Sequence, residues 1–118
     1  LLLQNLMNRG AALIGTEDPR LLLEEYAECK EALARSDNPS PVPARAGAQA
    51  DLLQRRDQFI AGRISATLGA GETGILFIGL MHRVDESLPE DIEVVPLISL
   101  LPFREVRERY WRLGSSKE

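Results

Sequence analysis

The chain has 118 residues, 44% hydrophobic and 27% charged, which fits one soluble globular domain. Acidic and basic residues are interleaved, and the formal net charge is −4. The chain therefore lacks the clustered positive charge that binds a nucleic acid or an anionic membrane, and we expect no nucleic-acid partner. Cys29 is the only cysteine and no apolar run approaches the ~20 residues of a membrane span; both features suit a cytoplasmic protein.

The first third of the chain shows a helix, a strand and a second helix. Apolar residues on one side of 1–9 predict a short helix, and the apolar run AALIGT at 11–16 predicts a buried strand. Asp18 is placed to cap the next helix, with Pro19 at its first position, where a missing N–H costs nothing. We expect this helix to continue to about Arg35.

The next stretch, residues 36–50, is rich in proline, small and polar residues. Such a segment cannot continue the preceding helix and has little to bury, so we predict a flexible, extended connection. Asp51 is then expected to cap a further helix that ends near Leu68.

Gly69, Gly71 and Gly74 match the G-x-G-x-x-G spacing of dinucleotide-binding loops. In those loops a strand precedes the glycines and a helix follows, so that helix N–H groups face the pyrophosphate. Here a predicted helix ends and a strand begins, which would turn helix carbonyls toward any phosphate. We therefore interpret these glycines as turn residues that allow positive φ, and expect no cofactor-binding loop.

The second half predicts two more strands, at 75–80 and 92–98, separated by a short helical turn within 83–91. A final helix is expected from about residue 102 to 113. Strands that alternate with helices predict an α/β fold, a single domain over 1–118 with helices packed on a small, mostly parallel sheet. Three strands make a small sheet, so the chain is either part of a larger domain or has a sheet edge that another chain covers.

His82, the only histidine, lies just past the end of the 75–80 strand. Glu17 and Asp18 occupy the same place after the 11–16 strand, and neighbouring parallel strands would bring these groups together at one edge. An imidazole and a carboxylate there can act as general acid and base or share a divalent metal. The alternative is that Asp18 caps its helix, Glu17 is solvated, and His82 bonds to Asp85 or to the main chain.

Arg56 is a further candidate, because a helix that carries it would aim the guanidinium across the strand ends at a carboxylate or an anionic substrate. The alternative is a solvated helix face on which Arg55 and Arg56 interact with Asp51 or Asp57.

Residues 55–95 resemble the C-terminal part of the TraB/TIKI/erythromycin-esterase-like superfamily. Arg56-Asp57 takes the place of an Arg-Asn pair that opens a helix, and an apolar strand then ends in G-x-x-H at Gly79–His82. Asp57 departs from the usual asparagine. The family's N-terminal half, with its own histidine and glutamate motifs, is not in this sequence, so the chain would hold at most half of such a site.

The resemblance implies a metal-dependent hydrolase with His82, Glu17 and Arg56 at the active-site edge, and with His82 and Glu17 as metal ligands. The substrate stays open. The alternative is a non-catalytic interaction or regulatory module that self-associates through a sheet edge or amphipathic helices.

Overall fold

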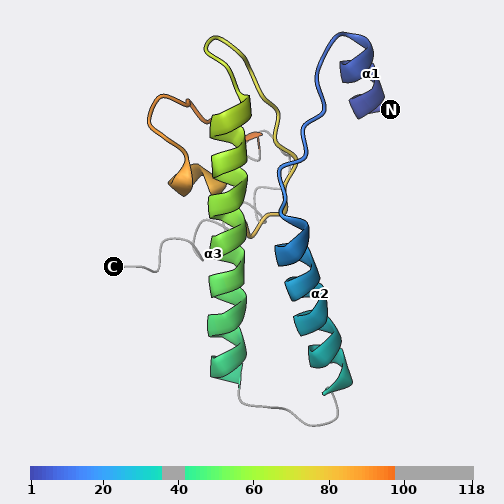
Figure 1. Ribbon diagram of the computed structural model, residues 1–118, viewed down its shortest axis with the longest axis vertical. Coiled ribbons are helices and arrows are strands. Elements are labelled where there is room, and N and C mark those ends of the chain that lie inside the picture. Colours follow the sequence, from blue (N-terminus) through green and yellow to red (C-terminus); the bar gives the residue numbers. More distant parts are fainter. Residues whose placement is uncertain (36–41, 98–118) are drawn as a thin grey trace.

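The computed structural model describes residues 1–35 and 42–97, with only the main chain between 42 and 46. Its elements, in order, are α1 (Leu2–Asn8), α2 (Pro19–Ala34), α3 (Val42–Thr67) and a 3₁₀ helix, η1 (Val84–Ser87). Helices α2 and α3 pack as an antiparallel hairpin, and η1 packs against the C-terminal half of α3 (Figure 1). The final helix predicted at 102–113 and the last residue of the 92–98 prediction lie outside the described residues.

Helices α1 and α2 confirm the predictions made from local signals. The carboxylate of Asp18 accepts a hydrogen bond from the Arg20 main-chain N–H at 2.9 Å, and Pro19 is the first helical residue. The Arg20 side chain, together with that N–H, lowers the pKa of the Asp18 carboxyl below its usual value. Asp18 is thus a charged N-cap at a helix end that favours negative charge.

Helix α3 starts earlier than predicted. It begins at Val42, so Asp51 is an interior residue and not a cap, and the expected flexible connection is wrong for residues 42–50. Pro43 stands in the first turn, where its missing N–H breaks no helical bond, and the alanine-rich sequence that follows favours a helix. Residues 36–41 of that prediction lie outside the described part.

The turn after α3 confirms the positive-φ interpretation for Gly71, whereas Gly69 and Gly74 do not adopt positive φ. The helix ends at Thr67, and Gly71 adopts a positive φ of 75°. The Glu72 carboxylate accepts a hydrogen bond from the Gly69 main-chain N–H at 2.7 Å and closes the turn. The chain then runs back along α3.

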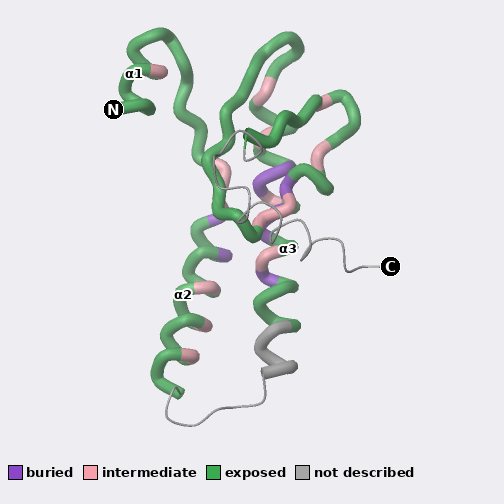
Figure 2. The backbone as a smooth tube through the Cα atoms, turned by 180° about the vertical axis from the view of Figure 1, so that it is seen from behind, coloured by how far each residue is buried: buried purple, intermediate pink, exposed green. Residues whose placement is uncertain are grey.

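The α/β prediction is wrong, because the described ranges 1–35 and 42–97 contain helices and no β-strand. Segments 11–16 and 72–79 are extended and run beside each other in the same direction (Figures 1 and 2), but they form no main-chain ladder, and neither does 92–97. An apolar run without helical periodicity indicates an extended path. A strand also needs a partner at the right distance, and the sequence pattern does not supply that information.

The apolar core lies between α3 and η1. Ile60, Ala61 and Val84 are buried there, and Ile64 and Leu88 pack against them (Figure 2). The core positions the site directly, because Val84 anchors the segment that carries His82. Within the described ranges, no helix combines the length and apolarity needed to cross a bilayer.

Candidate functional site

Two consecutive charged residues of α3, Arg56 and Asp57, form the centre of the candidate site. They are 8% and 5% exposed, so both charges have lost most of their contact with water. A buried charge is stable in a protein only when an opposite charge or hydrogen bonds compensate it. Each of the two is compensated by a residue from a different extended segment.

Arg56 binds the end of the 11–16 segment. Its Nη2 and Nε donate to the two carboxylate oxygens of Glu17 at 2.5 and 3.2 Å, and its Nη1 donates to Glu25 of α2 at 2.9 Å. The hydrogen bonds with Glu17 raise the pKa of the Arg56 guanidinium above its usual value. The predicted pairing of Arg56 with a carboxylate is therefore confirmed, and both oxygens of Glu17 are occupied by it.

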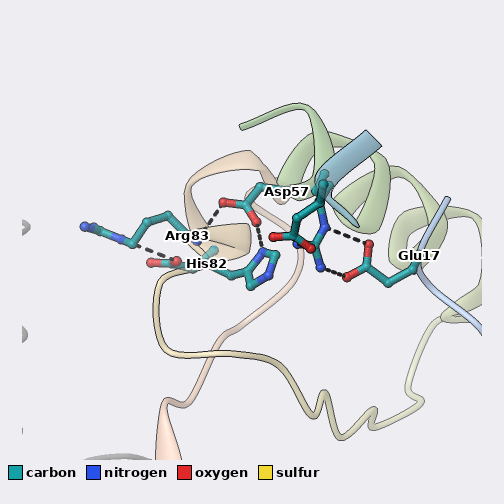
Figure 3. Close-up of polar contacts among 7 residues, drawn as sticks. Glu17, Asp57, His82 and Arg83 are labelled. Carbon is teal, nitrogen blue, oxygen red and sulfur yellow. Dashed lines mark hydrogen bonds and ion pairs between the residues drawn. The ribbon is translucent and has the colours of Figure 1, made fainter. Parts of the chain in front are cut away.

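Asp57 binds the end of the 72–83 segment. One carboxylate oxygen lies 2.5 Å from Nδ1 of His82 and the other accepts the main-chain N–H of Arg83 at 2.7 Å (Figure 3). The two side chains, Asp57 and His82, are each 7% exposed. The structure thus contains a buried carboxylate–imidazole pair in which both carboxylate oxygens have a donor.

The hydrogen bonds of this pair define the role of the second ring nitrogen. An ionised carboxylate only accepts, so the proton that lies between the two side chains is carried by Nδ1 of His82. In the neutral form of the ring Nε2 is then an acceptor, and it bonds to no residue that the structure describes. Because no fully buried side-chain nitrogen or oxygen in the described part lacks a partner, Nε2 retains contact with solvent.

The structure links the predicted residues in a different way from that expected. Glu17 and His82 mark the ends of two neighbouring segments, but no hydrogen bond or ion pair between them is present in the described part. Glu17 binds Arg56, and His82 binds the next residue of α3, Asp57. Figure 3 shows the Asp57–His82 contact. Of the alternatives, Asp18 does cap α2, whereas Glu17 is paired and the partner of His82 is Asp57, not Asp85.

The residues present do not fit the expected metal pair of His82 and Glu17. Both Glu17 oxygens are held by Arg56, and His82 has only Nε2 left. Among the residues with a defined placement, no three histidine, cysteine, aspartate or glutamate side chains gather into a group able to bind a metal ion. One free nitrogen is too small a ligand set for a resident divalent cation.

Sequence reasoning missed Asp57 and Glu25 as site residues. In the sequence, Asp57 is recognisable only as a neighbour of the arginines and as the residue in place of an asparagine. Its position next to Arg56 is the one sequence signal for its place in the site. Glu25 carries no such signal, because its contact with Arg56 depends on how α2 packs on α3.

No protein-family model matches the chain, and neither a curated protein nor a solved structure gives a significant match. The resemblance of residues 55–95 to the TraB/TIKI/erythromycin-esterase-like superfamily therefore stays a prediction, and the site has to be interpreted from its own geometry.

Proposed function

We propose that the chain contributes an acid–base site for hydrolysis, in which His82 is the general base and Asp57 orients it. The observation that carries this proposal is the 2.5 Å contact between Asp57 and Nδ1 of His82, which leaves Nε2 as the ring nitrogen without a partner in the described part of the chain. A carboxylate that holds one imidazole nitrogen while the other faces the reactants is the arrangement that hydrolytic enzymes use repeatedly.

In the proposed reaction, Nε2 of His82 takes a proton from water as the water oxygen bonds to the electrophilic carbon of the substrate. The imidazolium that forms is stabilised by the Asp57 carboxylate, which accepts hydrogen bonds from it and from the Arg83 main-chain N–H. When the bond to the leaving group breaks, Nε2 returns the proton to the leaving atom. Every step uses residues of this chain.

Arg56 has a positioning role in this proposal. Its guanidinium is occupied by Glu17 and Glu25, so it orients Glu17 and is not available for an anionic substrate group. The expected metal route is set aside because the donor atoms do not fit it, and no step depends on a cation.

The single histidine makes the proposal directly testable by nuclear magnetic resonance. In uniformly ¹⁵N-labelled protein at neutral pH, the only imidazole signals come from His82, and we expect a protonated Nδ1 and an unprotonated Nε2. Asp57→Asn should reverse this tautomer, because an amide N–H prefers an unprotonated Nδ1. A protonated Nε2 in the wild-type protein would contradict the proposal, since that nitrogen could not accept a proton.

A kinetic test uses p-nitrophenyl acetate, a neutral activated ester. His82→Gln should lower kcat/KM by about 10²- to 10⁴-fold, the usual contribution of a general base. Arg83→Gln is the matched control, because Arg83 donates to Asp57 through its main chain, which the substitution leaves in place. Equal rates for the wild-type and His82→Gln proteins would refute the catalytic role.

A further inference from the structure

The extended segment at residues 75–79, called here the apolar segment, exposes apolar side chains on both of its faces. Exposure alternates along it: Ile75 57%, Leu76 38%, Phe77 59% and Ile78 38%. This period of two is that of a β-strand with an outer face, Ile75 and Phe77, and an inner face that is only partly covered. A soluble chain seldom leaves such a run open to water.

The main chain of the same segment is also unpaired as far as Ile78, whereas the Gly79 C=O accepts the His82 main-chain N–H. From residue 73 to residue 78, no main-chain N–H or C=O hydrogen-bonds to any part of the chain that the structure describes. A lipid or an apolar small molecule would cover the side chains and leave these polar groups without partners. A second β-strand would satisfy both, because it supplies main-chain donors and acceptors together with apolar side chains.

We propose that a second copy of this chain covers the apolar segment, through antiparallel pairing of the two segments about a two-fold axis at Phe77. Two antiparallel strands related by a two-fold axis must place one residue opposite itself, and Phe77 is the middle residue of 75–79. In this register Leu76 faces Ile78 of the second copy, and Ile75 faces Gly79, which leaves room for the larger side chain.

A second copy provides apolar and main-chain complementarity with the same residues, because each copy offers Leu76, Phe77 and Ile78 together with unpaired main-chain groups.

The apolar surface continues beyond the segment, which enlarges the area available to a second copy. Phe77 lines an open groove of about 770 Å³ together with residues of the N-terminal helix, Leu1, Leu2, Leu3, Gln4 and Met7. A stable interface buries about 800 Å² on each partner, more than one short strand supplies, so we expect the groove to be covered with the segment.

Cysteine cross-linking tests the register. In a Cys29→Ser background, Phe77→Cys places two thiols opposite each other, about 5 Å apart between Cα atoms, within reach of a disulfide. Thr73→Cys is the control, because the same register separates its two copies by about 26 Å along the strands. We expect a covalent dimer with Phe77→Cys and none with Thr73→Cys under mild oxidation. Equal cross-linking at both positions would overturn the proposal.

Sedimentation equilibrium tests the interface without cross-linking. The wild-type chain should dimerise in a concentration-dependent manner, and Phe77→Lys should raise the dissociation constant at least tenfold by placing two ammonium groups at the axis. Leu23→Lys, on an exposed position of α2, should leave the constant unchanged. Far-UV circular dichroism of each variant confirms that the helices are intact. A monomeric wild-type chain at all concentrations, or a Phe77→Lys dimer as tight as wild type, would refute self-pairing.

This inference does not depend on the proposed hydrolysis. The kinetic test concerns His82 and Asp57, whereas the association test concerns Phe77, so either can fail alone.

Discussion

The neighbouring arginines of α3 allow a controlled test of the site's contribution to stability. Arg55 and Arg56 are adjacent residues of α3, and each forms two hydrogen bonds to the carboxylate of one glutamate. They differ in exposure: the Arg55 side chain is 44% exposed, whereas Arg56 is 8% exposed. Replacing each arginine in turn by methionine removes the charge and keeps a flexible side chain with a high helix propensity.

The expected magnitude follows from what Arg56→Met leaves behind. Glu17 loses the guanidinium that binds both of its carboxylate oxygens and stays partly buried, while Glu25 is exposed enough to be rehydrated. A hydrogen bond to a charged group contributes about 1.5–3 kcal/mol, so with some rehydration of Glu17 we expect a loss of about 2–3 kcal/mol. Arg55→Met should have little effect, because both members of its pair interact strongly with water.

Urea unfolding followed by far-UV circular dichroism measures both variants. With a slope of about 1–2 kcal/mol per molar urea, the midpoint for Arg56→Met should fall by about 1–3 M, and that for Arg55→Met should stay near wild type. Similar midpoints for the two variants would show that burial of Arg56 does not strengthen its pairing with Glu17.

Two further predictions concern local features. The pKa of Asp18 is lowered in the folded chain by Arg20, so its stabilising effect is complete above the ordinary value of 3.8 and is lost as the pH falls through the lower folded value. Asp18→Asn keeps a capping side chain and should reduce the loss of helical signal below about pH 4; an identical acid transition would contradict this assignment. Gly71→Ala forces a side chain onto a positive φ and should destabilise the fold by about 1 kcal/mol, whereas Gly62→Ala, within α3 and facing open space, should stabilise it by about 0.5–1 kcal/mol. Thermal unfolding checks both, and a shift of the same sign for the two variants would contradict the reasoning.

The features that sequence analysis predicted correctly depend on residues close together in the chain. The Asp18–Pro19 start of α2 and the Gly71 turn after α3 each result from neighbouring residues and allowed main-chain angles. The start of α3 also depends on residues close together in the chain, but it was predicted incorrectly. The prolines before Ala44 were weighed only as helix breakers, although proline is well accommodated in a first turn.

The features that were predicted incorrectly depend on tertiary position. Whether an apolar extended segment becomes a strand depends on a neighbour that offers a ladder, and 11–16 and 75–80 have none among the described residues. The choice of Asp57 over Asp85 as the partner of His82 depends on how far the 72–83 segment runs back along α3. Neither property can be derived from spacing within one sequence.

Helix α3 binds the ends of both extended segments through two consecutive buried charged residues. Its buried pair, Arg56 and Asp57, would be costly without partners, and the partners it finds are Glu17 and His82, one at the end of each segment. The positions of these two groups therefore do not require a main-chain ladder between the segments. It follows that Phe77→Lys, which would abolish the proposed pairing, should leave the His82 tautomer unchanged, whereas Asp57→Asn should alter the tautomer at any degree of association.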